Sequence, residues 1–383
     1  MTTTSRFAAA LGLVAVIGYG LAMAFPTADL RDYGSFVASG RAASVGDNPY
    51  GVYPLTFHVV LPGIDVWNPN LNPPISVLLF EWFDRVEPSR GFRLWWLASM
   101  ACYVVTIALL LRRYEARHPV LVALWALALA GFWDTLALGQ IYLPLVLAAV
   151  GAWLLLERDR PVAAGLLIGL VVAFKPNFAV WPALLLLAGH GRVATAAAGA
   201  AAMLSAVPLA THGPGIYRQW IALILADEGR AGFLTNASLA GLAHRLGAPD
   251  AGMAASVLLL LALAAWAARR RPGDMRASEF GIAAAILASP LAWVHYTLFL
   301  LPVFVARTFT PLFVASAVLL VVPVPVLLRL LGAPAWQQAT VGSVYNWAVL
   351  LCLAGLMFGA RHRRDPERTI PQPHGVPSRR STA

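Results

Sequence analysis

Charged side chains are scarce in this sequence. Asp, Glu, Lys and Arg make up 12% of the 383 residues, whereas hydrophobic residues make up 59%. The apolar residues form runs such as "LLIGLVVAF" and "LLLLALAAWAA" that recur along nearly the whole chain. This pattern excludes a soluble domain with a single anchor. Continuous runs favour membrane-spanning helices over the short alternating strands of a membrane barrel, so we predict an all-α polytopic membrane protein.

Cysteine is nearly absent as well. Cys102 and Cys352 both lie inside apolar runs without a neighbouring His or Cys, so we interpret them as small core residues and predict neither a disulfide nor a metal site. The sequence also has no Gly-rich phosphate loop and no nucleophile elbow. A P-loop pump or a soluble-type nucleotide-sugar enzyme would need a sizeable cytoplasmic domain that the chain lacks. We therefore predict no cofactor.

The net charge of +10 does not indicate a nucleic-acid partner. With the N-terminus inside, most of the arginines fall on the cytoplasmic side, as the positive-inside rule requires. The basic balance is therefore read as topology, with no nucleic acid as partner. About twelve spans are expected, near residues 7–25, 92–111, 119–137, 141–156, 161–174, 177–190, 193–211, 251–268, 277–289, 295–307, 310–331 and 343–360.

Two outward segments are long, at residues 26–91 and 212–250. Their stretches "YPLTFHVVLPGIDVW" and "IYRQWIALILADEG" are apolar and aromatic, so we expect short helices that lie along the membrane surface. We assign residues 1–360 to a single transmembrane catalytic domain. The Pro- and Arg-rich tail at 361–383 is predicted to be disordered.

Two apolar stretches, 161–190 and 277–307, carry an arginine at both ends. A single pass through the membrane would place one arginine of each pair on the wrong side, so we predict two helical hairpins that point outward. Each arm has roughly 14 residues, or about 20 Å of helix, whereas the hydrocarbon core is about 30 Å thick. The tips must therefore line a protein-walled or water-filled cavity inside the outer leaflet.

The residues at these tips are candidates for function. Lys175, the single lysine of the chain, lies in "FKPNF" at the first tip, and His295 lies in "SPLAWVHY" at the second. A buried cation needs a partner, and a phosphate would supply the countercharge. The alternatives are a lysine that snorkels at a helix end and a histidine with a structural role.

Other polar residues beside the apolar runs have local explanations. Asp134 and Gln140 mark a third outward tip, where we favour a helix cap for Asp134 and leave Gln140 open between a cap and a binding wall. Asn72 precedes Pro73 and Pro74, which is a helix-start signal with Asn72 as the capping side chain.

These groups suit glycosyl transfer from a lipid-linked phosphosugar. The leaving phosphate departs as a stable anion and needs cations rather than a general acid. The acceptor hydroxyl needs one carboxylate to take its proton. Asp29 or Asp32, just after the first span, fits the role of the base, and Lys175 with His295 and Arg31 fits the phosphate clamp.

The order of the motifs "DLRDY", "GDNPY", "NPPISVLLF", "LALGQ", "FKPNF" and "SPLAWVHY" resembles glycosyltransferase family 87, within the glycosyltransferase C superfamily. The resemblance implies an inverting α-mannosyltransferase of the plasma membrane, with a multi-pass fold and an extracytoplasmic site. Its donor would be polyprenyl-phosphate mannose and its acceptor a glycolipid or lipoglycan. The family's catalytic aspartate matches Asp29, with Asp32 less favoured; its lysine matches Lys175 and its histidine His295.

Five further residues in or beside these motifs are predicted to bind substrate: Tyr33, Asn72, Gln140, Asn177 and Tyr296. Three alternatives stay open at this point. A transporter or lipid flippase would also use paired broken helices, although it would not need the long carboxylate-bearing loop. A non-catalytic membrane scaffold and a transferase of another prenyl-phosphate sugar, such as arabinose, are the others.

Overall fold

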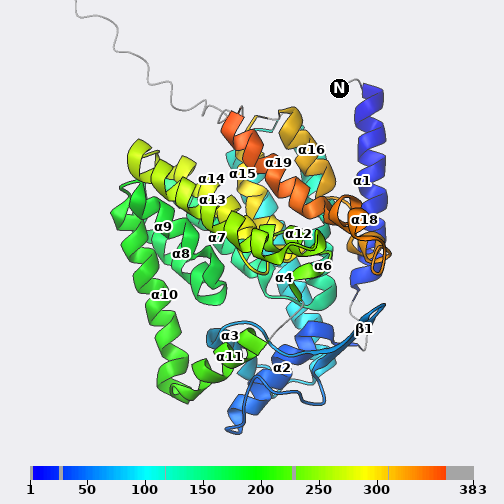
Figure 1. The fold of residues 1–383 in the computed structure, drawn as a ribbon, viewed down its shortest axis with the longest axis vertical. Coiled ribbons are helices and arrows are strands. Elements are labelled where there is room, and N and C mark those ends of the chain that lie inside the picture. The colour runs from blue at the N-terminus through cyan, green and yellow to red at the C-terminus, as the bar shows by residue number, and fades with distance from the viewer. Residues whose placement is uncertain (1–2, 26–28, 117, 227–229, 309, 359–383) are drawn as a thin grey trace, which may run out of the picture.

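Helices make up nearly all of the regular structure. The computed structural model describes residues 3–25, 29–116, 118–226, 230–308 and 310–358, so the predicted tail at 361–383 lies outside the described residues. The longer helices, drawn in Figure 1, are α1 (Thr3–Ala24), α2 (Arg31–Ser44), α4 (Pro88–Arg113), α7 (Tyr142–Glu157), α8 (Pro161–Phe174), α10 (Gly191–His212), α11 (Gly215–Ala226), α13 (Pro249–Arg270), α14 (Asp274–Leu287) and α19 (Val344–Phe358).

The remaining elements are shorter. The α-helices are α3 (Pro74–Glu81), α5 (Pro119–Ala128), α6 (Ala130–Leu138), α9 (Val180–Leu187), α12 (Leu239–Arg245), α15 (Leu301–Ala306), α16 (Pro311–Leu319), α17 (Val324–Leu328) and α18 (Ala335–Ala339). The 3₁₀ segments are η1 (Pro176–Ala179), η2 (Arg230–Gly232), η3 (Val294–Leu300) and η4 (Val341–Ser343). Two strands, β1 (Phe57–Leu61) and β2 (Ile64–Asn68), complete the set.

The helices confirm a helical membrane protein. Each of the twelve predicted apolar segments contains helix. Within the described part of the chain, five helices are long and apolar enough to cross a membrane, or six if the bent pair α5 and α6 forms one span. Several other apolar helices, including α7, α8 and α9, are shorter. The figure of twelve spans stays a prediction, because length and composition do not by themselves place the short helices in a bilayer.

The predicted span at 310–331 is not a single helix. In place of a continuous span over 310–331, α16 ends at Leu319 and α17 begins at Val324, directly after Pro323. Pro323 and Pro325 lack the amide hydrogens that a continuous helix would need, so the chain turns and restarts. The break leaves apolar turn residues beside the cavity described below.

The first predicted hairpin is confirmed by how α8 packs on α10. A side chain added at Gly165 would meet the backbone of Val193, and one added at Gly169 would meet that of Ala197. The contacts advance in the same direction along both helices, so α8 and α10 run parallel. Helix α9, which joins them, must therefore run back, and Lys175 lies at the turn.

The second predicted hairpin is confirmed by an ion cluster at its open end. Glu279 of α14 is fully buried and pairs with Arg276, with 3.4 Å between Oε2 and Nη1. The same carboxylate also pairs with Arg307, which directly follows α15. The two ends of the hairpin therefore meet, and the chain reverses between them near His295.

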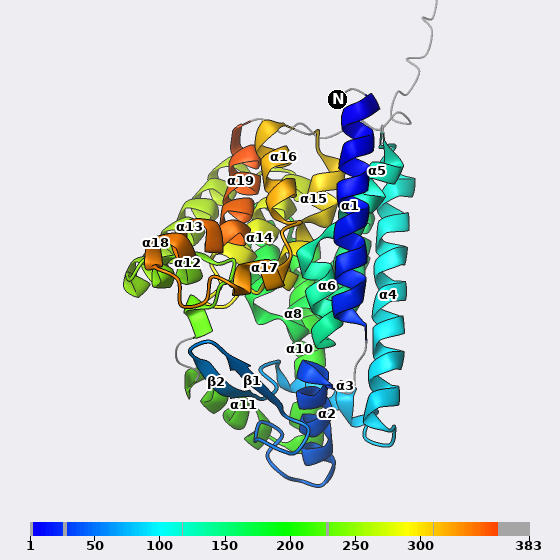
Figure 2. The ribbon, with the colours of Figure 1, turned by 90° about the vertical axis from the view of Figure 1, so that its right-hand side faces the viewer.

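The long segments that we predict to face outward build a layer at one end of the bundle, which we call the outer layer. Figure 2 shows α2, α3, α11 and the two strands beneath the bundle, at the end opposite the N-terminus. The helix predicted in "IYRQWIALILADEG" is confirmed as α11, whereas its position along the membrane surface stays a prediction. This layer and the hairpin tips close around the same space.

The predicted surface helix in "YPLTFHVVLPGIDVW" is wrong, because this stretch forms a β-hairpin. Strands β1 and β2 pair antiparallel, with Leu61 opposite Ile64. Val59, Val60 and other β-branched residues favour strands, and Gly63 takes the left-handed conformation (φ +77°) that the tight turn needs.

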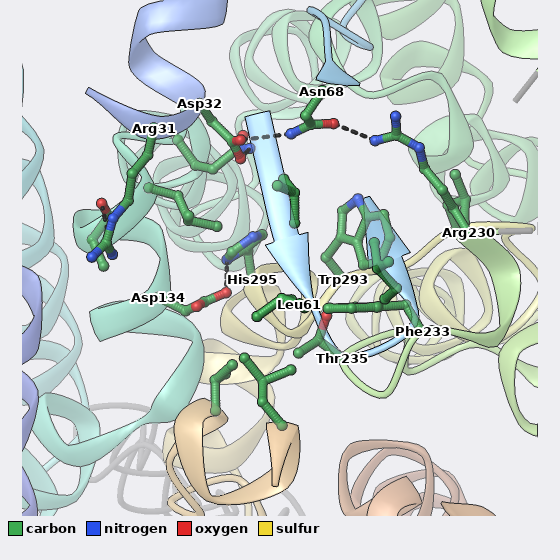
Figure 3. Close-up of a pocket in the computed structure, with 18 of the residues that line it drawn as sticks. Arg31, Asp32, Leu61, Asn68, Asp134, Arg230, Phe233, Thr235, Trp293 and His295 are labelled. Carbon is green, nitrogen blue, oxygen red and sulfur yellow. Dashed lines mark hydrogen bonds and ion pairs between the residues drawn. The ribbon is translucent and has the colours of Figure 1, made fainter. Parts of the chain in front are cut away.

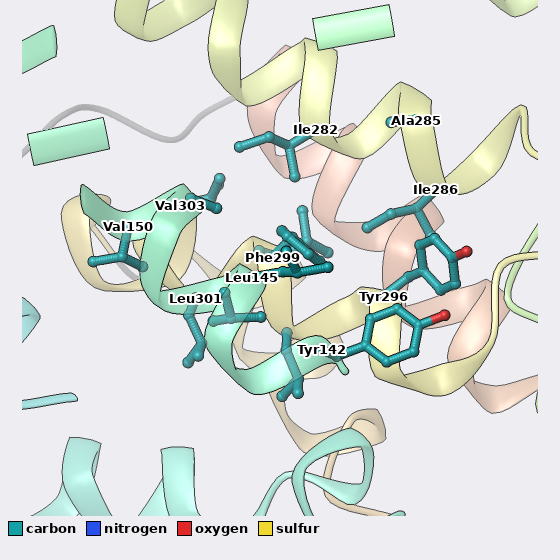
Figure 4. Packing of buried hydrophobic residues seen from close by; sticks show 14 of the residues in the cluster. Tyr142, Leu145, Val150, Ile282, Ala285, Ile286, Tyr296, Phe299, Leu301 and Val303 are labelled. Atoms are coloured by element: carbon teal, nitrogen blue, oxygen red, sulfur yellow. The ribbon is translucent and has the colours of Figure 1, made fainter. Parts of the chain in front are cut away.

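A buried apolar cluster holds the two hairpins together. Phe178 of η1, in the first hairpin, packs on Phe299 of η3, in the second, with 4.3 Å between the ring centroids. Figure 4 shows Phe299 between Leu145 of α7 and the α14 residues Ile282 and Ile286. Ile282, Ile286, Phe299 and Leu145 are at most 5% exposed. Interiors of this kind are close-packed, so they fix the positions of the side chains at their edge. The tips that carry Lys175 and His295 are therefore anchored on the same core.

Candidate active site

A large cavity opens between the outer layer and the hairpin tips. Its volume is about 1560 Å³. Helices α1, α6 and α17, the β-hairpin, η1 and η3 all contribute to its wall. Nine of the ten predicted site residues line it: Asp29, Arg31, Asp32, Asn72, Gln140, Lys175, Asn177, His295 and Tyr296.

Lys175 lies at the end of α8 and is only 6% exposed. Its Nζ donates a hydrogen bond of 2.6 Å to Asn72 Oδ1. The same nitrogen lies over the ring of Tyr142 at 4.1 Å and over that of Tyr296 at 5.5 Å. Aromatic faces and an amide oxygen stabilise a cation without neutralising it. The charge of Lys175 thus remains available for an anion in the cavity.

The predicted capping role of Asn72 is wrong. Helix α3 has Pro73 at its N-cap and no side-chain cap bond. Asn72 instead turns its oxygen to Lys175, and its Nδ2 donates to Asn70 Oδ1 at 3.0 Å. As predicted, the helix begins with prolines, which have no amide hydrogen that a capping side chain would need to bind.

His295 contacts a carboxylate. It is 3% exposed, and its Nδ1 lies 3.4 Å from Asp134 Oδ2 and 3.3 Å from Thr135 Oγ1. The predicted cap role of Asp134 is wrong, because the residue lies within α6 and Leu129 is the N-cap. A carboxylate beside one ring nitrogen orients the imidazole and leaves the other nitrogen for a ligand. The imidazole also packs on Tyr142, with 4.9 Å between ring centroids, so Tyr142 touches both Lys175 and His295.

Asp32 lies deep in the cavity wall at 4% exposure. Its Oδ1 accepts a 2.6 Å hydrogen bond from Asn68 Nδ2, and its Oδ2 accepts a 2.5 Å bond from Gln140 Nε2. Burial raises the pKa of Asp32 above its usual value, against the lowering effect of the two amide donors. Figure 3 shows Asn68 between Asp32 and Arg230, whose guanidinium donates to Asn68 Oδ1.

Asp29 lies at a more open place in the same cavity. Its side chain is 62% exposed, and its Oδ2 lies 3.7 Å from Arg31 Nε. Arg31 also donates to the Ala137 carbonyl at 3.4 Å. In Figure 3 the Arg31 side chain extends away from Asp32 and His295. Asp32 lies near enough to Lys175 for its charge to act on that ammonium group.

Tyr33 does not reach the cavity. It is fully buried, with its ring stacked on Phe92 at 5.2 Å and edge-on to Phe80 and Phe83. Its position on the apolar face of α2 directs it into this aromatic cluster, so we correct it from a substrate-binding residue to a core residue. Asn177 does line the cavity, and its Nδ2 donates to the Ala285 carbonyl at 3.0 Å.

Sequence reasoning missed Asn68, Tyr142 and Arg230 as site residues. Asn68 stands in the polar stretch "WNPN", and Tyr142 follows Gln140 by two positions, so both had a weak local signal. Arg230 had none, because it is one of several arginines in a long loop. Its place beside Asn68 depends on the packing of segments far apart in the chain.

The fold and cavity define a helical membrane protein with a polar site at one end of its bundle. The chain belongs to glycosyltransferase family 87, whose profile matches residues 70–292. This match confirms the family that the motifs indicate. It includes Asn72, Gln140 and Lys175, whereas Asp29, Asp32 and His295 lie outside it.

Two curated relatives are similar to the chain. A polyprenol-phosphate-mannose-dependent alpha-(1-2)-phosphatidylinositol mannoside mannosyltransferase of Mycolicibacterium smegmatis is 30% identical over 246 residues, which are 55% of this chain and 55% of the relative. The chain thus spans about half of that protein. A polyprenol-phosphate-mannose-dependent alpha-(1-2)-phosphatidylinositol pentamannoside mannosyltransferase of Mycobacterium tuberculosis is 26% identical over 95% of this chain and 90% of the relative. No solved structure matches the chain.

Proposed function

We propose that the protein transfers mannose from polyprenyl-phosphate mannose to a mannosylated phosphatidylinositol or related glycolipid at the outer face of the membrane. The observation that carries this proposal is the convergence of Lys175 and His295, from two separate hairpins, on Tyr142 in a cavity that also holds Asp29 and Asp32. The names of the two relatives support the choice of donor and acceptor.

The cavity offers suitable surroundings for both parts of a lipid phosphosugar. Lys175 and His295 supply cationic and hydrogen-bonding groups for the phosphate. Apolar residues of α1 and of the turn around α17 would face the prenyl chain, which needs a surface without polar groups. They are Val16, Met23, Val321, Val324, Leu328 and Leu331.

The reaction needs one base and one anion clamp. The acceptor oxygen attacks the anomeric carbon of mannose as its proton passes to a carboxylate, and the bond from that carbon to the phosphate oxygen breaks. The electron pair leaves with the phosphate, and Lys175 and His295 stabilise the negative charge that develops there. Attack opposite the leaving group inverts the anomeric centre.

We propose Asp29 as this base. A base needs an oxygen that the acceptor hydroxyl can reach, and the Asp29 side chain is 62% exposed. Asp32 is 4% exposed and has an amide donor on each oxygen, which suits a fixed residue better than one that exchanges a proton with a substrate. The family motif "DLRDY" supports the same choice.

The alternatives are less well supported. The paired hairpins would also suit a transporter, but membership of a glycosyltransferase family favours a transferase over a transporter or a scaffold. No observation favours arabinose as the donor sugar, because both relatives are named for mannose.

The test is transfer of labelled mannose by the purified protein from polyprenyl-phosphate mannose to a phosphatidylinositol mannoside. We expect Asp29→Asn to lose about 10²-fold or more of the rate with donor binding retained. Lys175→Ala should weaken donor binding, measured by equilibrium binding of the labelled donor. Full activity of Asp29→Asn together with inactive Asp32→Asn would exchange the two roles. Transfer from polyprenyl-phosphate arabinose but not from the mannose donor would overturn the donor assignment.

A further inference from the structure

The β-hairpin is fixed to the outer layer at its base. The Phe57 amide donates to Ser35 Oγ at 2.9 Å, and Ser35 Oγ donates to the Asn68 carbonyl at 2.6 Å. Ser35 lies on α2, one turn after Asp32, and is 2% exposed. One buried hydroxyl therefore joins both strands at the end away from the turn at Gly63.

Both strands of the hairpin contribute to the cavity wall. Residues directly opposite each other in an antiparallel pair share a face. The pairs Phe57 with Asn68, Val59 with Val66 and Leu61 with Ile64 thus form one face, and all six residues line the cavity, as do His58, Val60 and Asp65 of the other face. The hairpin forms one wall of the cavity, with a polar residue at its base and apolar residues toward its turn.

A chain of hydrogen bonds connects the β-hairpin to three other segments. Arg230, in η2 of the second outer loop, donates to Asn68 Oδ1 and, through Nη2, to the Trp67 carbonyl at 3.2 Å. Asn68 Nδ2 donates to Asp32 on α2 at 2.6 Å. Gln140, in the turn between α6 and α7, donates to the other oxygen of Asp32 at 2.5 Å.

The chemistry of the groups fixes the direction of this chain. A guanidinium can only donate hydrogen bonds, and an ionised carboxylate can only accept them. An amide placed between the two must turn its oxygen to Arg230 and its nitrogen to Asp32. Arg230 therefore determines the orientation of the Asn68 amide, and the amide in turn holds one oxygen of Asp32.

We propose that Arg230 and Asn68 are positioning residues that seat the β-hairpin over the cavity and hold Asp32 in place, so that the second outer loop is coupled to the reaction site. The position of the β-hairpin over the cavity is inferred from the hydrogen bonds of Arg230 and Asn68 alone. The catalytic consequence rests on the proposed transferase function. Lys175, Asp134, Arg31 and Arg230 are the charged groups around Asp32, so its charge helps to balance the cations of the cavity.

Hydrogen exchange of the substrate-free protein in detergent tests the seating. Asn68→Ala and Arg230→Ala should each speed exchange of the hairpin amides at 57–68 by about tenfold, the effect of losing a charge-assisted hydrogen bond. Arg218→Ala is the matched control, because Arg218 is an exposed arginine of α11 in the same outer loop but outside this chain of bonds. Unchanged hairpin exchange in both test variants would overturn the proposal.

Transfer kinetics test the catalytic consequence. We expect kcat to fall about tenfold in Asn68→Ala and Arg230→Ala with the donor KM unchanged, and Arg230→Lys to recover part of the loss because it keeps a cationic donor. Arg218→Ala should behave as wild type. Altered exchange with an unaltered kcat would overturn the coupling to the reaction. An inactive wild type would overturn the proposed function and the catalytic consequence with it, while the exchange data still decide the seating.

Discussion

The two hairpins that carry Lys175 and His295 share a plan but are closed by different forces. The first closes by contact, because Gly165 and Gly169 of α8 let the backbone of α10 approach. The second closes by charge, because the buried Glu279 forms ion pairs with arginines at both ends of this hairpin. Small residues allow close helix packing anywhere along an interface, whereas an ion cluster fixes one point.

The two hairpin tips also differ in the groups that surround Lys175 and His295. Lys175 faces an amide oxygen and two aromatic rings, and its positive charge stays uncompensated at short range. His295 faces the carboxylate of Asp134, which decides how the ring is oriented. One tip therefore presents an amino group that lies over aromatic faces, and the other presents an oriented hydrogen-bonding group.

The largest effect on stability is expected from removing the ion cluster that closes the second hairpin. Glu279→Gln leaves Arg307 buried without its carboxylate and should lower the free energy of unfolding by about 3–5 kcal/mol. Thermal unfolding in detergent measures it. The double variant Glu279→Gln with Arg307→Met should recover part of the loss, because it removes the more deeply buried arginine and leaves only Arg276, whose side chain is 32% exposed, without this carboxylate. A cost below about 1 kcal/mol for the single variant would show that the cluster does not close the hairpin.

A smaller effect on stability is expected from disturbing the close packing of α8 on α10 in the first hairpin. Gly169→Ala places a methyl group against the backbone of Ala197 and should cost about 1–3 kcal/mol of stability through overpacking. Gly199→Ala is the matched control on α10, where an added methyl group meets nothing. There the better helix propensity of alanine should leave stability unchanged or slightly raised. Equal behaviour of the two variants would contradict the proposed closure by contact.

The smallest effect is expected at the second tip. Asp134→Asn keeps the shape of the side chain but removes the charge beside His295, and kcat should fall about tenfold, or about 1.4 kcal/mol. Donor binding should change less than in Lys175→Ala, because the Lys175 side chain at the first tip remains. Steady-state transfer and donor binding, measured on both variants, check this order. Loss of donor binding in Asp134→Asn as large as in Lys175→Ala would remove the distinction between the tips.

Local patterns predicted the parts of the site that depend on one segment. The arginines at the ends of 161–190 and 277–307 predicted both hairpins, because charge placement in a membrane is a strong local constraint. The burial of Lys175 and His295 at the tips followed from the short arms. The β-hairpin was missed because its apolar and aromatic residues suit a surface helix as well as a strand, and its turn signal at Gly63 was overlooked.

The sequence by itself determined an apolar helical bundle, two shortened hairpins, a polar residue at each tip and the membership of the family. Only the tertiary structure decided the partners within the site. Lys175 bonds to a residue 103 positions away, and Gln140 bonds to one 108 positions away. It also directed Tyr33 into the core. Periodicity and charge act through neighbours along the chain, whereas these contacts depend on how whole helices pack.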